Sequence, residues 1–362
     1  MKRIIALTLL CGLLLCGCRK EPVSEQTETG ASSEMPSKVS SEMLSEEGKK
    51  TEMITFNNKL AENGNDPWVI FKNGYYYYCY SGKGGIYVSQ SENLSEIAES
   101  EAKLVWEPDD SEFNSEIWAP ELHYVRDKWY IYVAADDGDN YNHRMLCLEG
   151  TSDSPLDTFK TKSVLRARTD RWAIDGTVMQ YKDKLYFIWS GWEGFDNVSQ
   201  NLYIAEMDTP WSITGDRVLI SSPEFDWEKN GGSPLINEGP TVLEKDGVFH
   251  IVYSASGSWC DDYCLGLLTL KGEDPLDIKS WEKSESPVFA KTDKVFGPGH
   301  ASFTTSPDGN RHYIAYHANE VSGTGWEGRK LWVQEFFFDE NNYPIFGTPN
   351  VAGTMQTVEE NI

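Results

Sequence analysis

The sequence has few basic residues and no long helical pattern after its first segment. Lys and Arg number 32 against 57 Asp and Glu among 362 residues, which gives a formal net charge of −25. Such a chain lacks the basic surface that nucleic-acid phosphates require, so we expect no nucleic-acid partner. The missing helical period predicts a nearly all-β fold.

Cysteine is scarce outside the N-terminal segment. Of the seven Cys, three lie within the first 18 residues, and Cys79, Cys147, Cys260 and Cys264 remain. No CxxC pair and no zinc-ligand spacing occurs among them. An extracytoplasmic compartment would permit a disulfide, but Cys260 and Cys264 could pair only across a tight turn. We therefore predict free, buried thiols.

The N-terminal segment has the pattern of a processing signal. MKR forms a positive region and IIALTLLCGLLL an apolar one that is too short to span a bilayer comfortably. Leu15-Cys16-Gly17-Cys18 resembles a bacterial lipoprotein signal, in which Cys18 would be lipidated. We predict a signal peptide over residues 1–17 and a secreted protein that contacts the membrane only through its lipid. An ordinary secretory signal peptide is the alternative.

The segment that follows is polar. Residues 18–55 are rich in Ser, Glu, Thr and Lys and nearly free of aromatic residues. Such a composition buries too little apolar surface to offset the entropy of ordering. We predict a disordered tether over 18–55 and a folded domain over 56–362.

A hairpin pattern recurs beyond residue 60. Each copy is a short apolar strand, a polar turn and a longer aromatic strand, and a third strand usually follows. The copies are WVIFKNGYYYYCYS and residues 120–135, 176–191, 239–256 and 300–318. Turn sequences such as Lys-Asn-Gly and Lys-Asp-Gly are typical of tight β-hairpins. The period of roughly 50–60 residues predicts a five-bladed β-propeller, with a β-sandwich as the alternative.

Polar residues open each predicted hairpin. They are Asp66, Ala119-Pro120-Glu121, Asp175, Glu238 and His300. Inner strands of a propeller begin at one end of its axis, so these residues are expected to converge. Asp66 alone could serve a turn. A fold that needs only turns would not gather three carboxylates, because they repel and raise each other's pKa values.

Paired carboxylates indicate glycoside hydrolysis. One must be protonated to release the leaving oxygen, and the other must be ionised to act as base or nucleophile. A third carboxylate would raise the pKa of the acid. Trp118, Trp189, Trp192 and Trp259 lie near the inner-strand ends and are candidates for stacking on sugar rings, with ordinary core packing as the alternative.

Taken together, these motifs resemble glycoside hydrolase family 43 over residues 60–350. The resemblance runs through GNDPWVIFKNGYYYYCYS, EIWAPELHYVRDKWYIYVAA, AIDGTVMQYKDKLYFIWSG, NEGPTVLEKDGVFHIVYSAS and FGPGHASF. It implies a five-bladed propeller acting on arabinose- or xylose-containing polysaccharides. It also implies Asp66 as general base, Glu238 as general acid, and Asp175 as the residue that orients the acid and raises its pKa. Inversion would require carboxyl groups about 6.5–9.5 Å apart.

The same resemblance suggests two further roles. Arg329 would contact the terminal sugar, and His300 would lie on the axis, where some members hold a calcium ion. Calcium prefers oxygen ligands, so His300 would act through water. No cofactor is expected to be required. A propeller family acting on fructans shares the Asn-Asp-Pro motif with a retaining mechanism, but the spacing to Asp175 and Glu238 fits it less well.

The stretch YSASGSWCDDYCLGLL resembles members that remove single arabinofuranose units. We therefore expect an exo-acting α-L-arabinofuranosidase on arabinan or arabinoxylan. A β-xylosidase and an endo-arabinanase are the alternatives within the family. A non-catalytic, glycan-binding surface lipoprotein is the alternative of another class, and the intact Asp66, Asp175 and Glu238 disfavour it.

Overall fold

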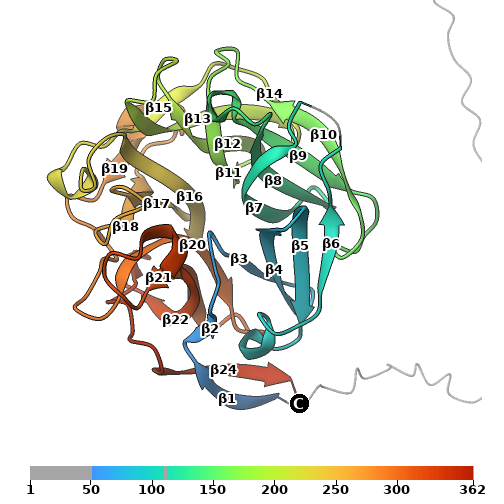
Figure 1. The fold of residues 1–362 in the computed structure, drawn as a ribbon, viewed down its shortest axis with the longest axis vertical. Helices are drawn as coiled ribbons and strands as arrows, with labels where there is room; N and C mark the ends of the chain where they lie inside the picture. The colour runs from blue at the N-terminus through green and yellow to red at the C-terminus, as the bar shows by residue number, and fades with distance from the viewer. Residues whose placement is uncertain (1–50, 110–111, 362) are drawn as a thin grey trace, which may run out of the picture. The chain divides into compact units, whose positions relative to one another are not determined.

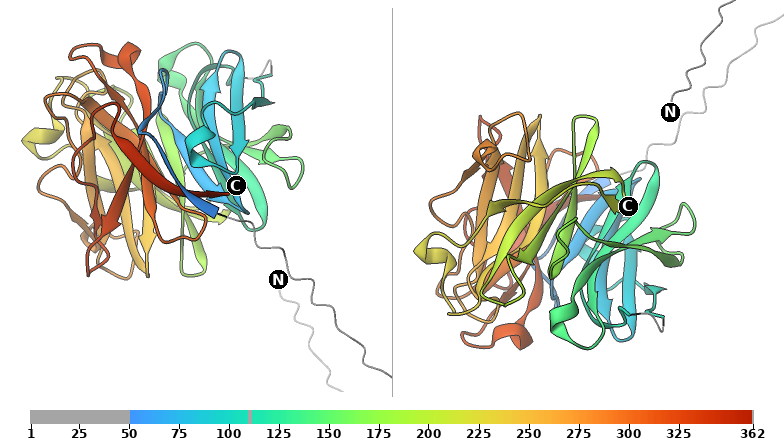
Figure 2. Two further views of the ribbon diagram at one scale, coloured as in Figure 1. Left: turned by 90° about the horizontal axis from the view of Figure 1, so that it is seen from below. Right: turned by 90° about the horizontal axis from the view of Figure 1, so that it is seen from above.

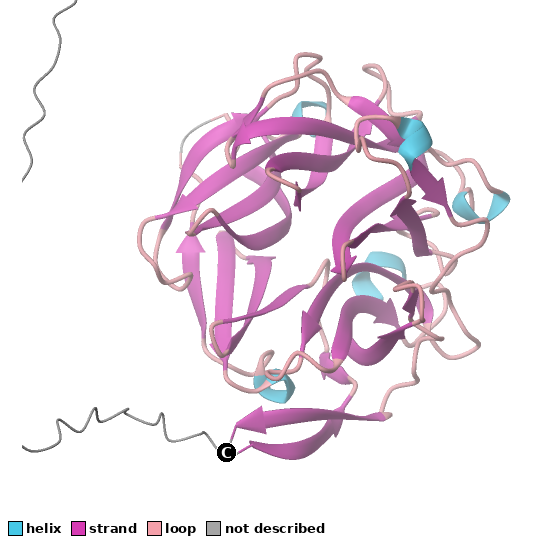
Figure 3. Ribbon diagram, turned by 180° about the vertical axis from the view of Figure 1, so that it is seen from behind, coloured by secondary structure: helices cyan, strands magenta, loops and turns pink. Residues whose placement is uncertain are grey.

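The computed structural model describes residues 51–109 and 112–361, which lie within the unit Lys49–Ile362. In these residues the regular structure is β-strand with short 3-10 turns and no α-helix (Figure 3). The expected all-β fold is therefore confirmed. Among the described residues no helix is long and apolar enough to cross a membrane. The predicted signal peptide, Cys18 and residues 18–50 of the predicted tether lie outside the described residues.

All five predicted hairpins are present as antiparallel strand pairs. The pairs are β3 (Trp68–Lys72) with β4 (Tyr75–Gly82), β7 (Ser115–Val125) with β8 (Lys128–Asp136), β11 (Ala173–Tyr181) with β12 (Lys184–Trp192), β16 (Leu235–Lys245) with β17 (Val248–Ala255), and β20 (Phe296–Thr305) with β21 (His312–Asn319). In the first turn Asn73 and Gly74 both have positive φ, 53° and 84°. Two consecutive positive φ angles match the twist of the flanking strands, which explains the Asn-Gly pair.

Outer strands extend each hairpin into a sheet. They are β5 (Gly85–Ser91) and β6 (Ala102–Trp106), β9 (Arg144–Gly150) and β10 (Phe159–Leu165), β13 (Ser199–Thr209) with β14 (Ser212–Ile213) and β15 (Val218–Ser221), β18 (Cys264–Leu270) and β19 (Trp281–Lys283), and β22 (Lys330–Phe338) with β23 (Pro344–Ile345). The 3-10 turns are η1 (Leu94–Glu96), η2 (Asn140–Asn142), η3 (Asp226–Glu228), η4 (Ile278–Ser280) and η5 (Gly325–Gly328). A short parallel pairing of β13 with β16 joins the third sheet to the fourth.

The two ends of the described chain pair with each other. Strand β1 (Thr51–Asn57) pairs with β24 (Met355–Asn361), and β2 (Lys59–Ala61) pairs with β22 as the outer strand of the fifth sheet. Strand β1 begins five residues before the expected boundary at residue 56. Its partner strand is about 300 residues away in sequence, so composition near residue 51 could not reveal the pairing.

The sheets lie around a common axis. Figure 1 shows β3, β7, β11, β16 and β20 nearest its centre, and the side views in Figure 2 show strands running between the two ends of this axis. The starts of these inner strands therefore face a shared region, as the repeat predicted.

The core is divided among the gaps between successive sheets. Within the described residues five apolar clusters occur, and each combines residues of two neighbouring sheets in the cyclic order first–second, second–third, third–fourth, fourth–fifth and fifth–first. Aromatic rings fill several of these gaps. Tyr77 meets Trp129 edge-on at 5.4 Å, and Tyr132 meets Phe187 at 5.4 Å. The aromatic strands of the hairpins thus supply inter-sheet packing.

The described cysteines are free thiols, as predicted. Cys79, Cys147 and Cys264 are buried, whereas Cys260 is half-buried because it lies in the loop after β17.

A buried hydroxyl links the first and fifth sheets. Ser302 Oγ donates to Pro67 O (2.8 Å) and accepts from Val69 N (2.9 Å) with no exposed surface. We expect Ser302→Ala to lower the free energy of unfolding by about 1–3 kcal/mol, because both backbone groups lose a buried partner. Urea denaturation checks this, with exposed Ser152→Ala as a control expected within about 0.5 kcal/mol of wild type. Equal stability of the two variants would contradict the prediction.

Candidate active site

One backbone feature recurs on all five inner segments. A residue at or just before each inner strand takes a left-handed conformation: Asp66 (φ 45°), Ala119 (45°), Asp175 (53°), Gly239 (54°) and His300 (48°). In β7, β11, β16 and β20 the pairing register shifts around this residue, which marks a bulge. Bulges redirect side chains, and left-handed non-glycine residues cost about 1–3 kcal/mol each. The repeated strain points to a site at this level.

Glu238 is offset from the other carboxylates by one residue. The left-handed position in β16 belongs to Gly239, and Glu238 precedes it, as Trp118 precedes Ala119 in β7. A Cβ on Gly239 would lie 3.2 Å from the His300 ring, so only glycine fits there without displacement. The Gly239 N–H donates to Asp175 Oδ2 at 3.0 Å, which joins the third and fourth inner strands.

The three predicted carboxylates do converge. Asp175 and Glu238 are buried, at 3% and 7% exposed, and the Asp66 side chain is 22% exposed. The negative charge of Asp66 raises the pKa of both other carboxyl groups, as only near neighbours do. The structure thus brings these groups from distant inner strands into one region, and their catalytic roles stay a prediction.

Asp66 is held ionised. Burial opposes its charge, but His300, Arg329 and His317 outweigh burial and keep the pKa of Asp66 well below its usual range. Arg329 Nη1 donates to Asp66 Oδ1 at 3.1 Å, and the Nδ1 atoms of His300 and His317 lie 3.2 and 3.3 Å from the same oxygen. Burial lowers the pKa of both histidines, that of His317 to about 3.

The pKa values of Glu238 and Asp175 are both raised. Burial is the largest cause for Glu238 and raises its pKa to about 7, against opposing effects of a hydrogen bond from Tyr263 and the charge of Arg329. Burial and then the charge of Glu238 raise the pKa of Asp175 well above its usual range. Carboxyl groups with pKa values pushed apart are the requirement for acid–base catalysis.

Two contacts of these groups were missing from the sequence prediction. Tyr263 OH donates to Glu238 Oε1 at 2.9 Å, and the buried Tyr263 ring stacks on His317 with centroids 5.6 Å apart. His317 pairs with Gly299 across β20 and β21, one residue from His300, so the fifth hairpin held the signal that could have found it. Tyr263 lies in the loop after β17, where no periodic pattern marks its position.

Arg329 is part of the site, but its contacts are with the protein. It is 9% exposed, and its second guanidinium nitrogen, Nη2, donates to Ser258 O at 3.1 Å. Its predicted contact with a terminal sugar stays a prediction. The contact with Asp66 is the part that the sequence did not indicate.

The predicted aromatic residues are divided between the site and the core. Trp118 is half-buried at the bulge of β7 and stacks on His143 at 4.1 Å. Trp259 is half-buried in the loop that carries Ser258. Both lie on segments that reach the carboxylates, and their contact with sugar stays a prediction.

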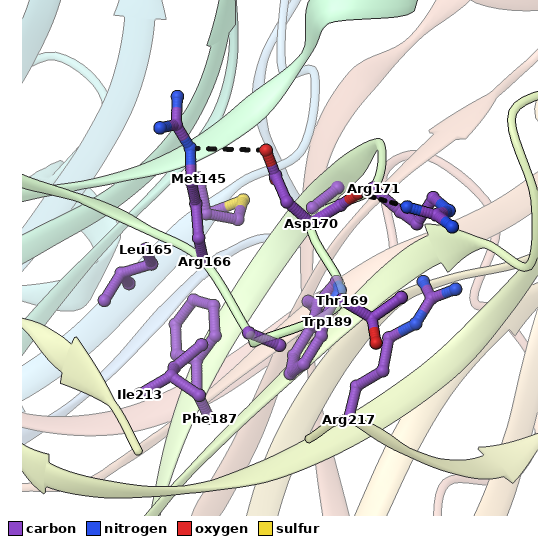
Figure 4. A pocket seen from close by; sticks show the side chains of 12 residues that line it. Met145, Leu165, Arg166, Thr169, Asp170, Arg171, Phe187, Trp189, Ile213 and Arg217 are labelled. Atoms are coloured by element: carbon purple, nitrogen blue, oxygen red, sulfur yellow. Dashed lines mark hydrogen bonds and ion pairs between the residues drawn. The ribbon is translucent and has the colours of Figure 1, made fainter. Parts of the chain in front are cut away.

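Trp189 lies in the interior between the second and third sheets. It is 4% exposed and packs on Phe187 at 5.8 Å. Figure 4 shows both rings lining a pocket with Arg166, Arg171 and Arg217. Trp189 therefore packs in the core between these two sheets, and its contact with sugar stays a prediction.

The surroundings of His300 offer few ligands for calcium. Calcium takes six to eight oxygen ligands, whereas His300 and His317 present imidazole nitrogens and Asp66 is engaged by Arg329. In the described part of the chain no group of three or more His, Cys, Asp or Glu is placed to hold a metal. Nε2 of His317 is buried without a partner among the described residues, so a calcium ion here would take most ligands from water. Calcium stays a prediction, and no chemical step depends on it.

The arrangement is that of an acid–base hydrolase, and comparison with known proteins identifies the class. The chain belongs to glycosyl hydrolases family 43, whose model matches residues 57–344. It is 32% identical over 315 residues to an extracellular exo-α-(1→5)-L-arabinofuranosidase of Streptomyces avermitilis, covering 83% of this chain and 65% of that protein.

Two further relatives are similar over more of their length. An extracellular exo-α-(1→5)-L-arabinofuranosidase of Streptomyces chartreusis is 32% identical over 275 residues, which is 73% of this chain and 83% of the relative. The crystal structure of an α-L-arabinofuranosidase from Lactobacillus brevis superimposes with a TM-score of 0.76 at 33% identity, covering 83% of this chain and 98% of that one. The chain spans slightly less than two thirds of the Streptomyces avermitilis protein.

The hydrogen bond from Tyr263 favours the ionised form of Glu238, so its removal should raise the pKa of Glu238 further above about 7. We expect this shift in Tyr263→Phe, measured by carbon-13 NMR titration of labelled glutamate carboxyls. Tyr253→Phe is the matched control, because it removes an equivalent 3.0 Å bond from another buried glutamate, Glu228. A Glu238 pKa that falls or stays unchanged in Tyr263→Phe would contradict the assignment.

Proposed function

We propose that the chain is an inverting, exo-acting α-L-arabinofuranosidase that removes terminal arabinofuranosyl units from arabinan- or arabinoxylan-type saccharides. The observation that carries the proposal is the opposed state of two converging carboxyl groups. The charges of His300 and Arg329 lower the pKa of Asp66 against its burial, and burial raises the pKa of Glu238 to about 7. Similarity to proteins named as arabinofuranosidases supports the choice of sugar.

In the proposed mechanism the oxygen of a water molecule attacks the anomeric carbon, and Asp66 accepts a proton from that water. Glu238 donates its proton to the glycosidic oxygen as the bond to that oxygen breaks. The net reaction adds one water, and the two side chains then exchange protons with solvent. Inversion requires about 6.5–9.5 Å between the two carboxyl groups, so that water fits between base and sugar.

Asp175 orients the acid in this scheme. Its Oδ2 accepts from the N–H of Gly239, the residue directly after Glu238. The charge of Glu238 in turn raises the pKa of Asp175, and burial raises the pKa of Glu238 itself. The Tyr263 hydroxyl opposes this effect and keeps the pKa of Glu238 near the working range of a general acid.

The proposal includes a propeller of five blades. The cyclic order of the apolar clusters and the left-handed residue repeated on five inner segments support this count. Each sheet would be one blade, with β2 completing the fifth.

The proposal also includes secretion and lipid anchoring at Cys18. The Leu15-Cys16-Gly17-Cys18 sequence and the polar residues that follow support it, and two relatives are named extracellular. The anchor would place the enzyme at the cell envelope, where polymeric substrates are accessible.

Substitution of either proposed catalytic group should abolish most activity. We expect Glu238→Gln and Asp66→Asn to lower kcat on arabino-oligosaccharides by about 10²–10⁴-fold, the contribution of a general acid or base. Proton NMR of the first product should show β-arabinofuranose from an α-linked substrate. Retained configuration would refute the mechanism, and faster turnover of xylosides would favour the β-xylosidase alternative. Wild type and Glu238→Gln that bind arabinan but are equally inert would favour the glycan-binding alternative.

The lipid anchor is tested separately. In bacteria fed a labelled lipid precursor, we expect label on the wild-type chain and none on Cys18→Ser, because the thiol is the acceptor. Cys79→Ser is the matched control and should keep the label. Equal labelling of Cys18→Ser would refute the anchor without touching the catalytic proposal.

A further inference from the structure

Trp326 is an exposed aromatic residue on a fixed support. It lies in η5, and 56% of its surface is exposed, whereas no other tryptophan among the described residues is comparably open. Its indole N–H donates to Ser258 Oγ at 3.1 Å. Its ring stands nearly perpendicular to Trp259, with an interplanar angle of 87° and centroids 6.2 Å apart. The nitrogen points to the protein, which leaves ring surface for a partner.

The support is rigid because two loops are bonded to each other. Asp261, in the loop after β17, accepts from Ser322 Oγ at 2.5 Å and from Gly323 N at 2.8 Å. Trp259 Nε1 donates to Gly231 O at 3.1 Å, which fixes the neighbouring ring. The Trp326 ring is thus held over these loops rather than packed in the core, so its exposed surface is available to a partner.

Trp326 is connected to the ionised carboxylate by three consecutive contacts. Ser258 receives the Trp326 indole N–H on its hydroxyl and Arg329 Nη2 on its carbonyl, both at 3.1 Å. Arg329 Nη1 then donates to Asp66. These contacts place the exposed ring at the outer edge of the site, whereas Glu238 and Asp175 are buried.

We propose that Trp326, supported by Trp259, binds the sugar of the leaving group, the unit to which the removed arabinose is attached. This inference rests on the proposed exo action. An exo enzyme holds the terminal unit innermost, beside the buried carboxylates, so an exposed ring at the rim meets the next unit. The C–H bonds of a neutral sugar carry slight positive charge and pack on the negative face of an indole ring. The expected ligand is thus a neutral saccharide rather than an anionic one.

A purely structural role for Trp326 makes a different prediction. Loss of its bond to Ser258 would displace Arg329 and reduce the activity on every substrate alike. If Trp326 binds the leaving group, its loss reduces activity only on substrates whose leaving group is a sugar. The informative quantity is therefore the ratio of kcat/KM for α-(1→5)-linked arabinobiose to that for methyl α-L-arabinofuranoside.

We expect Trp326→Ala to lower this ratio about 3- to 10-fold, mainly through KM for the disaccharide, as loss of one aromatic contact gives. Trp326→Phe removes the bond to Ser258 but keeps an aromatic face, so it should recover most of the ratio. Phe337→Ala is the matched control. Phe337 is 60% exposed at the far end of β22, about 25 Å of extended strand from Arg329, and its loss should leave the ratio unchanged.

The outcomes separate the two proposals. An active wild type with an unchanged ratio in Trp326→Ala overturns the leaving-group role alone, as does a Trp326→Phe variant no better than Trp326→Ala. A wild type inactive on both substrates overturns the proposed function and this inference with it.

Discussion

The left-handed backbone at the start of each inner segment is the constraint on which the site depends. At these positions the chain leaves regular pleating, and the side chain is redirected from the face of the sheet. Extended strands would have directed Asp66, Asp175 and His300 into the inter-sheet packing, where a charge is expensive. The strain is stored in backbone, and the five apolar clusters between the sheets stabilise the fold that carries it.

The basic groups around Asp66 distinguish it from the other two carboxyl groups. Burial opposes the charge of Asp66 and of Glu238 alike. At Asp66 the charges of His300, Arg329 and His317 outweigh burial, and all three side chains contact the same carboxylate oxygen. Arg329 reaches Glu238 more weakly than burial does, so the pKa of Glu238 is raised. The difference between the two acids therefore follows from which of them the basic side chains contact.

Sequence reasoning predicted well what is local or repeated. Two-residue turns such as Asn73-Gly74 can be predicted from sequence because Asn and Gly favour the positive φ angles that these turns need. The repeat placed Asp66 and Asp175 together without any knowledge of contacts. It failed where the result depends on the course of a loop. Tyr263 reaches Glu238 from a loop whose course no pattern encodes.

Register was the other limit of the sequence prediction. Glu238 was aligned with Asp66 and Asp175, although the bulge residue of its strand is Gly239, one position later. A bulge inserts one residue without altering the hydrophobic pattern around it, so an offset of one cannot be read from periodicity. The pairing of β1 with β24 was missed for a different reason, since about 300 residues separate the two strands in sequence.

The pairing of β1 with β24, and of β2 with β22, limits the order in which the sheets can form. Strand β2 is synthesised early, but its partner β22 is synthesised about 270 residues later. Strand β1 likewise can pair only after β24 has been synthesised. The four preceding sheets can form during synthesis, but the fifth sheet gains β2 only after β22 has been made. A chain that lacks β1 or β24 keeps Asp66, Asp175 and Glu238. The remaining strand of the pair then has an unpaired edge, which is a template for aggregation.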